Sequence, residues 1–503
     1  MIKAWTGKRL RIDLSLQKAW TEDIPAGDLR QWFGGRGLNA SFFSQHFSSP
    51  VSSSSPENPI AFAVGPLTGT LAPCSGWTSI ATFSPLLDSP RYGYTRMPGH
   101  FGASLKGAGF DQCILQGKAD RPVYLWIDNG KVRFEDAHPL WGRETTETTV
   151  AIQEEKGDRS IEVLCIGPAG EQRFPFANVI HRLSWTGDRL GLGYLFGVKQ
   201  VKAIAIRGKK PVTLHDPRRF LSLCLALKGR IQKDRKMQRL KETGTLSPLG
   251  LEGGEMINNG NGRVLPGSEK QWAASLGTYL SGQESCFSCP VHCGRNIQHE
   301  ETYLGGIHLE KAWHLGPKIG VYDGEWTLKL HRLCQAQGLD PFLTSSLLAK
   351  IMEGVEDGPL SEKDLRETDH ILEQGEKASA LLHRIVRGSK NGFHLFVPTL
   401  SENNDLDVLA DIISFCMIVV NRLNLVTVSN IIELINAATG HTLSVEDLRD
   451  TVWNILQMEA CLQNKGLHLS HKPAPPLMGE DQMKEIVKKE ERNNESIIHQ
   501  TTS

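Results

Sequence analysis

Neither sign of charge is in excess in this sequence. Its 503 residues include 56 lysines and arginines and 56 aspartates and glutamates, so the formal net charge is zero. Proteins that bind nucleic acid or anionic membranes through charge need a basic surplus. We therefore expect neither nucleic acid nor a membrane surface among the partners.

Long hydrophobic runs are also lacking. The richest run, 409–420, contains Asp411 and is shorter than the roughly 18 apolar residues that indicate a membrane span. The first fifteen residues contain no uninterrupted apolar stretch of the kind that a signal peptide needs. We expect a cytoplasmic protein. Of its ten cysteines three lie within eight residues, and this crowding favours a metal site over a disulfide framework.

The first two hundred residues have the pattern of a β-rich domain. Short apolar runs at 60–64, 78–83, 123–127 and 202–206 are separated by turn residues. Asp128-Asn129-Gly130 lies between two strand-like runs and predicts a hairpin.

Beyond residue 208 the periodicity becomes helical. Helices are predicted over 217–242, 324–356, 363–387, 406–423, 428–438 and 445–463, with Ser444 and Asp447 at the start of the last one, and a loop over 243–272. The predicted fold class is α+β: a β-rich N-terminal domain (1–210), mostly α-helical C-terminal domains (211–477) and a charged tail (478–503).

Three cysteines lie within eight residues, in the order Cys286-Phe-Ser-Cys289-Pro-Val-His-Cys293. Three close thiolates with a fourth from elsewhere are typical of an iron–sulfur cluster. A zinc site completed by His292 or a distant cysteine is the main alternative, and unliganded core cysteines are a third. The spacing leaves the fourth ligand open among Cys334, Cys416 and Cys461.

Five motifs follow one another in the first two hundred or so residues. They are Gly34-Gly35-Arg36-Gly37-Leu38, Gly65-Pro66-Leu67-Thr68-Gly69-Thr70, the 100–111 stretch from His100 to Asp111, Cys165-Ile166-Gly167-Pro168, and Lys202-Ala203-Ile204-Ala205-Ile206. In this order they resemble the aldehyde:ferredoxin oxidoreductase family of tungsten-pterin enzymes. The resemblance continues through the cysteine motif to about Leu477.

The resemblance implies a site as well as a fold. In the family a D-x-x-G-L-C segment supplies the fourth cluster ligand and a pterin contact; here that segment is Asp411 to Cys416, which favours Cys416 over Cys334 and Cys461. The remaining residues that it implies are Arg36, Gly37, Arg189, Gly191 and Asp340 for the pterin cofactor, and Glu310 as the active-site carboxylate.

The cofactors implied by the resemblance are a [4Fe–4S] cluster and a tungsten or molybdenum bis-pterin centre. The family oxidises aldehydes and passes the electrons through the cluster to ferredoxin, so the resemblance implies a small aldehyde-type substrate and a ferredoxin or another iron–sulfur carrier as partner. A homodimer is a further possibility that the family suggests.

Three departures from the family pattern also matter. Trp77 stands where the family has an arginine, unless Arg91 or Arg96 replaces that group. Leu190 fills a glycine position beside Arg189. Residues 393–405 bridge a much longer family segment, and His394 is the sole histidine that they offer. These departures open an alternative, in which the chain is a catalytically impaired paralogue that serves as an electron-transfer or scaffold subunit.

Overall fold

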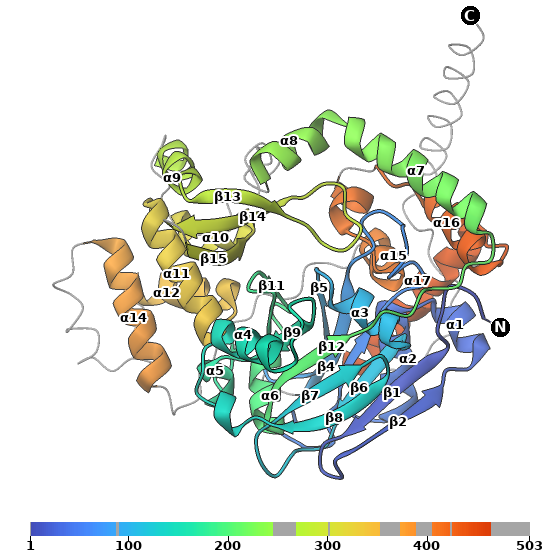
Figure 1. Cartoon of the computed structure of the whole chain (residues 1–503), viewed down its shortest axis with the longest axis horizontal. Coiled ribbons are helices and arrows are strands. Elements are labelled where there is room, and N and C mark those ends of the chain that lie inside the picture. Colours follow the sequence, from blue (N-terminus) through green and yellow to red (C-terminus); the bar gives the residue numbers. More distant parts are fainter. Residues whose placement is uncertain are drawn as a thin grey trace, which may run out of the picture.

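The computed structural model describes residues 2–86, 90–244, 268–299, 302–352, 373–388, 405–422 and 425–463. In these ranges two six-stranded sheets form the N-terminal part, and helices with one small sheet follow (Figure 1). The predicted α+β class, β-rich first and mostly helical afterwards, is confirmed. The charged tail and His394 lie outside the described residues, and the predicted domain boundaries stay predictions.

The first sheet has the order β2-β1-β6-β3-β4-β5. Alternate residues of β3 face two different cores: Ala61 and Ala63 pack with the C-terminal helices, and Ile60 and Phe62 pack toward the second sheet. The strands are β1 (Lys8–Asp13), β2 (Lys18–Asp23), β3 (Ile60–Ala63), β4 (Thr78–Ser84), β5 (Arg91–Met97) and β6 (Gln112–Gln116).

The second sheet has the order β11-β10-β9-β12-β7-β8. Asn129 (φ 49°) and Gly130 (φ 98°) form the predicted tight turn between β7 and β8, since a hairpin turn of this kind needs positive φ at both positions. The strands are β7 (Val123–Asp128), β8 (Lys131–Asp136), β9 (Glu162–Cys165), β10 (Ile180–His181), β11 (Trp185–Thr186) and β12 (Val201–Arg207).

The helices of the N-terminal part pack on these sheets. Helix α2 covers β3, β4 and β6, and α3 packs on β12. Their bounds are α1 (Ala26–Trp32), α2 (Gly35–His46), α3 (Phe101–Ala108), α4 (Thr145–Glu155), α5 (Pro168–Glu171) and α6 (Leu192–Lys199).

The C-terminal part has two groups of helices, one on each side of the cysteine motif. The bounds are α7 (Pro217–Lys233), α8 (Arg235–Thr243), α9 (Ser268–Gly277), α10 (Leu309–Leu315), α11 (Gly324–Gln337), α12 (Pro341–Met352), α14 (Gln374–Gly388), α15 (Asp405–Ile413), α16 (Val428–Thr439) and α17 (Val445–Gln463). The predicted cap of α17 is present, because Ser444 and Asp447 exchange hydrogen bonds. Helices α15 and α17 pack on α2, far away in the sequence (Figure 1).

Four local predictions need correction. The helical part contains a three-stranded sheet, β13 (Leu280–Glu284), β14 (Gly294–His299) and β15 (Thr302–Ile307), and the loop predicted over 243–272 includes the start of α9. The helix predicted over 324–356 is divided at Gly338, which ends α11 with φ 71°. The helix over 406–423 breaks after Ile413 at Ser414, whose φ is 62°, and a π-turn follows at Ile418–Arg422. Within the helix predicted over 363–387, the structure describes only the part from residue 373.

Candidate metal centre

The cysteine motif forms the loop between β13 and β14. Two segments that are distant in the sequence, the loop between β3 and β4 and the chain after α15, lie next to it. The loop between β3 and β4 holds the motif on one side, since the Cys74 N–H donates to the Ser288 carbonyl (3.1 Å). On the other side the same loop holds the chain after α15, since the Cys416 N–H donates to the Cys74 carbonyl (2.9 Å). These main-chain bonds fix the position of Cys416 relative to the motif.

The four cysteines predicted as ligands lie in one group. Cys286, Cys289, Cys293 and Cys416 are all half-buried. Burial and the neighbouring sulfurs raise the pKa values of Cys286 and Cys293 above the ordinary range, and burial followed by Cys289 raises the pKa of Cys416 to about 11. Each of these thiols acts on the charge of the others, so they are neighbours.

The other candidates for the fourth ligand lie elsewhere. Cys334 is buried in the core formed by α10, α11 and α12, and Cys461 lies in the last turn of α17. In the described ranges no three Cys, His, Asp or Glu side chains are grouped so that they could hold one metal ion. A [4Fe–4S] cluster differs from such a site because each of its four cysteines binds a different iron atom.

Cys74 is a fifth cysteine in this group, and sequence reasoning missed it. Its Sγ atom is 3.7 Å from Sγ of Cys289, and only 1% of the residue is exposed. The hydrogen bond with Cys289 and burial raise the pKa of the Cys74 thiol well above its ordinary range, and the same bond lowers the pKa of Cys289. Either sulfur of the pair can be the donor when both are thiols. In the family that the sequence resembles, the corresponding stretch reads G-S-G-R, whereas this chain has Cys74-Ser75-Gly76-Trp77. The signal in the sequence is therefore a cysteine at a glycine position.

Asp411 and Arg36 form the centre of a buried ion-pair network. Arg36 is fully buried, with Nε and Nη2 donating to the two carboxylate oxygens of Glu459 (2.8 and 2.5 Å) and Nη1 3.5 Å from Asp411. Burial would lower the pKa of Arg36, but Glu459 and Asp411 outweigh burial and raise it. Glu459 had no signal in the sequence, because it is one carboxylate in a charged helix.

Arg96 occupies the neighbourhood of the missing family arginine. Its Nη1 atom is 3.1 Å from Asp411, and its guanidinium lies 5.7 Å from the centroid of the Trp77 ring. The charge of Arg96 also acts on the pKa of Cys416. Of the two substitutes considered for the arginine lost at Trp77, Arg96 is thus the one beside Asp411.

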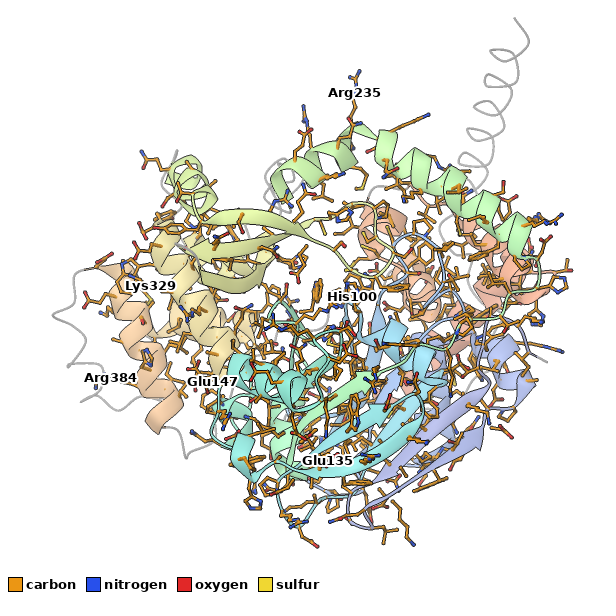
Figure 2. All side chains as sticks on the ribbon, viewed as in Figure 1. His100, Glu135, Glu147, Arg235, Lys329 and Arg384 are labelled. Carbon is orange, nitrogen blue, oxygen red and sulfur yellow. The ribbon has the colours of Figure 1, made fainter. Side chains whose placement is uncertain are left out.

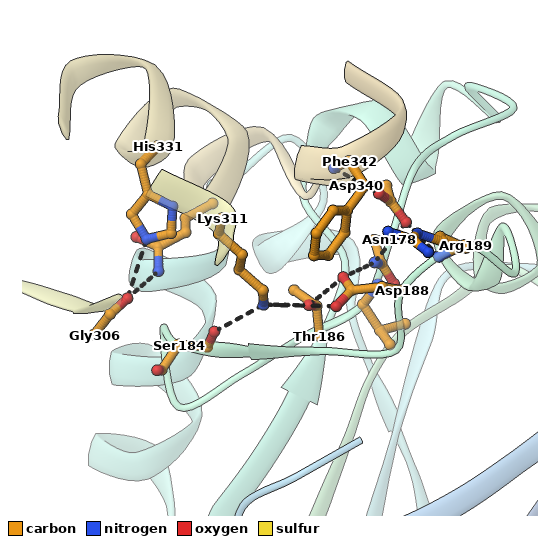
Figure 3. A network of polar contacts seen from close by, with 12 residues as sticks. Asn178, Ser184, Thr186, Asp188, Arg189, Gly306, Lys311, His331, Asp340 and Phe342 are labelled. Atoms are coloured by element: carbon orange, nitrogen blue, oxygen red, sulfur yellow. Dashed lines mark hydrogen bonds and ion pairs between the residues drawn. The ribbon is translucent and has the colours of Figure 1, made fainter. Parts of the chain in front are cut away.

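Asp340 forms a second polar centre, which Figure 3 shows. Its carboxylate accepts hydrogen bonds from the main-chain N–H groups of Arg189 and Phe342, and from the side-chain amide of Asn178 (3.4 Å). Burial, followed by the charge of Asp188, raises the pKa of Asp340 to about 6. The Arg189 guanidinium lies 4.5 Å from the centroid of the Phe342 ring.

The glycines of the motifs allow chain segments to touch. A Cβ atom at Gly35 would lie 2.0 Å from the Asp411 carbonyl oxygen, and one at Gly65 would lie 2.4 Å from the Ile413 carbonyl carbon. Gly37, in α2, packs against the Trp32 carbonyl at the end of α1, and Gly191 caps α6 with φ 70°. The close contacts at Gly35 and Gly65 bring the chain around Asp411 against the segment of Arg36. The assignment of Gly37 and Gly191 to the pterin site stays a prediction.

The structure places Glu310 in the first turn of α10, where it is half-buried. Its neighbour Lys311 points into the interior, where Nζ contacts Thr186 Oγ1 and the Ser184 carbonyl (Figure 3). In the described part of the chain, no hydrogen bond joins the Glu310 carboxylate to Asp411 or to Asp340 and their partners. Its assignment as the active-site carboxylate stays a prediction.

Buried polar atoms without a protein hydrogen bond test whether a polar cofactor fits beside the cysteine motif. In the described residues these atoms include Trp77 Nε1, Thr78 Oγ1 and Trp185 Nε1. Gly99 lies against Trp185, and Gly102 lies against Thr78, so these residues border the start of α3, which follows His100, labelled in Figure 2. Unsatisfied buried donors need partners, and a pterin with its phosphate and ring acceptors would supply them. The donor set fits such a group.

Comparisons with known proteins identify the family of the chain. The family model described as the aldehyde ferredoxin oxidoreductase N-terminal domain matches residues 9–208, and the one described as domains 2 and 3 of the same proteins matches residues 222–395. The chain belongs to the aldehyde ferredoxin oxidoreductase family. The predicted resemblance is therefore confirmed over most of the chain.

Curated relatives within and around the family differ in function. A tungsten-containing aldehyde ferredoxin oxidoreductase of Pyrococcus abyssi is 33% identical over 368 residues, 71% of this chain and 60% of the relative. An aliphatic sulfonate oxidoreductase, WOR-like subunit, of Pyrococcus furiosus is 27% identical over 415 residues, 76% of this chain and 64% of the relative. The chain thus spans about 60% of the length of the tungsten-containing aldehyde ferredoxin oxidoreductases that it matches.

A solved structure confirms the fold. The active site complex BamBC of benzoyl coenzyme A reductase, in complex with 1,5-dienoyl-CoA, matches with a TM-score of 0.78 at 20% identity, covering 95% of this chain and 92% of the other. At this identity the likeness concerns the fold alone. Separately, none of the helices in the described ranges has the length and apolar character needed to cross a membrane.

Proposed function

We propose that this chain is an oxidoreductase that acts on aldehyde or oxo groups, with a [4Fe–4S] cluster and a tungsten or molybdenum bis-pterin centre. The observation that carries the proposal is the convergence of Cys286, Cys289, Cys293 and Cys416 beside the buried Arg36–Asp411 network. Hydrophobic packing does not require four cysteines from two distant segments to be neighbours, whereas an iron–sulfur cluster requires four thiolate ligands around one site.

The pterin centre would be held between the Asp411 and Asp340 carboxylates. When bound, its metal exchanges two electrons with the substrate and the cluster relays single electrons. The chain's own residues supply fixed charge: Arg36 and Arg96 hold Asp411 in place, and Arg189 and Asn178 hold Asp340. Side chains fixed in this way do not need to reorganise when a cofactor binds.

Glu310 is the proposed acid–base group for the substrate. A half-buried carboxylate at a helix start can accept a proton from a small aldehyde hydrate, provided that the substrate reaches it. Lys311, anchored on Ser184, fixes the first turn of α10 and so the position of Glu310. Replacing Glu310 by Gln keeps the size of the side chain, so a loss of turnover without loss of metal would support its role.

A ferredoxin or a similar acidic iron–sulfur protein is the proposed electron acceptor. Helices α7 and α8 share a hydrophobic core with Cys289, Cys293 and Cys416. They expose all their lysines and arginines, whereas the sole acidic residue within the two helices is Glu242. Lys241 lies beside the motif, because its carbonyl accepts from Arg295 (2.6 Å), and Arg235 projects outward from the end of α8 in Figure 2. A basic face over a redox centre favours docking of an acidic carrier.

Salt and charge reversal test the proposed acceptor site. Electron transfer to an acidic ferredoxin should slow steeply as ionic strength rises, and Lys241→Glu should slow it at low salt. Arg218→Glu, at the far end of α7, is the matched control and should have a smaller effect. Equal effects of the two reversals would contradict docking beside the motif.

The alternative, an electron-transfer or scaffold subunit without an active pterin centre, is favoured by Trp77 at the family's arginine position. Metal analysis of protein purified without oxygen from a tungstate- and molybdate-fed host separates the two. About four iron atoms with one tungsten or molybdenum and a releasable pterin support the enzyme. Four iron atoms alone support the subunit, and zinc without iron contradicts both.

A further inference from the structure

The fifth cysteine, Cys74, occupies a position that the four ligands do not require. It lies in the loop between β3 and β4, with Sγ 3.7 Å from Sγ of Cys289 and almost no exposed surface. Its main-chain groups already join the motif to the Cys416 segment, as described above, and those bonds need no side chain at all. The presence of a thiol there therefore needs its own explanation.

The backbone conformation at residue 74 is unfavourable for cysteine. Cys74 has φ 65°, in the left-handed region, where a residue with a Cβ atom is strained and glycine is not. The family motif that this stretch resembles has glycine at the position. Gly76, two residues later, packs so tightly that a Cβ would lie 2.8 Å from the Phe287 nitrogen, so the loop is pressed against the motif. A strained residue held at a functional site indicates that its side chain has a task.

We propose that the Cys74 thiol remains protonated beside the bound cluster and donates an S–H···S hydrogen bond to the Cys289 sulfur, which raises the reduction potential of the cluster. The inference rests on the proposed cluster. Once Cys289 binds iron it carries no proton, so Cys74 is the donor. Reduction adds negative charge that spreads onto the cysteine sulfurs, and a donor at one sulfur stabilises the reduced form.

The size of the effect follows from the weakness of the donor. A thiol is a weak hydrogen-bond donor, so its removal should change the ratio of reduced to oxidised cluster at a fixed potential by a few-fold, up to about tenfold. For a one-electron couple, tenfold corresponds to about 59 mV. The shift should be negative, because the reduced cluster loses the stabilisation.

The test is a redox titration of the cluster, followed by electron paramagnetic resonance on the full-length protein with its cluster in place. Cys74→Ala and Cys74→Gly should keep about four iron atoms per chain and shift the potential to more negative values. Cys74→Ser retains a donor and should lie closer to the wild type. Cys113→Ala, a buried cysteine on β6 away from the cluster, is the matched control and should leave the potential unchanged.

The outcomes separate this inference from the proposed function. A wild-type chain that binds no cluster overturns both. A wild-type cluster whose potential is the same in Cys74→Ala, Cys74→Gly and Cys74→Ser overturns the hydrogen bond alone. Loss of the cluster in both Cys74→Ala and Cys74→Ser, with retention in Cys289→Ala, would mean that Cys74 is a ligand and would also overturn it. If Cys74→Ala fails to fold, Cys74→Gly decides, because glycine accepts the left-handed backbone.

Discussion

Replacing Glu459 by alanine should destabilise the protein more than most single substitutions. Glu459 holds the fully buried Arg36 guanidinium with two hydrogen bonds of 2.8 and 2.5 Å. Without it, the remaining carboxylate is that of Asp411, 3.5 Å away and already paired with Arg96 at 3.1 Å. Breaking a buried ion pair by removing one partner costs about 3–5 kcal/mol, because the other charge stays buried. We expect the free energy of unfolding to fall by about that amount.

The assay is urea denaturation followed by circular dichroism, on protein purified without oxygen. Asp450→Ala, an exposed acidic residue on the same helix, is the matched control and should change the free energy of unfolding by no more than about 0.5 kcal/mol. The double variant Arg36→Met/Glu459→Leu removes both charges and should cost less than Glu459→Ala alone. A cost below about 1 kcal/mol for Glu459→Ala would refute the reasoning. So would a double variant whose loss of unfolding free energy equals the summed losses of Arg36→Met and Glu459→Leu measured separately.

Three further predictions concern the cluster, acid stability and packing. Cys416→Ser should abolish the visible absorption of the cluster and lower the iron content, whereas Cys461→Ser should leave both unchanged; an intact cluster in the first variant rules out Cys416 as ligand. Burial lowers the pKa of His331 to about 4 from an ordinary value of 6.5, so His331 takes up a proton on unfolding. The free energy of unfolding should therefore fall as pH drops from 6.5 towards 4, by up to about 1.4 kcal/mol per pH unit from this group. His331→Asn should flatten the dependence of the urea midpoint on pH. An unchanged slope would show that His331 does not contribute to the loss of stability in acid. Gly65→Ala places a Cβ against the Ile413 backbone and should destabilise the fold by about 1–3 kcal/mol and reduce the bound iron. Gly229→Ala, with open space around its Cβ, is the control and should be neutral or stabilising. Similar effects of the two substitutions would contradict the packing role of Gly65.

Local signals in the sequence were enough for much of the fold. The hairpin at Asp128–Gly130 depends on a turn that only certain residues make, and the start of α17 depends on a cap formed by Ser444 and Asp447. Both are decided within a few residues, so reading them needs no knowledge of the tertiary structure. The four proposed ligands needed more, because Cys416 was selected by a family motif and not by spacing.

What the sequence concealed depends on contacts between distant segments. The sheet around the cysteine motif has strands with glycines at 282, 294, 305 and 306, which have low β propensity and conceal it from pattern analysis. The break after α15 lies in an apolar run that a helix could equally well occupy, and tertiary bonds between the 74–77 loop and Ser414 and Cys416 stabilise it there. Arg36 and Glu459 are 423 residues apart, and no local rule pairs them.

The arrangement of the cysteines also determines when the centre can form. Three of the proposed ligands lie in one short loop, but the fourth follows α15, and the loop that joins them is at residues 72–77. A growing chain can therefore complete the binding site only after most of it has been synthesised and the C-terminal helices have packed against α2. Iron and sulfide delivered earlier would meet an incomplete set of thiols, so loading of the proposed cluster would belong to the last stage of maturation. The bound cluster would then cross-link the 286–293 loop to the segment that follows α15.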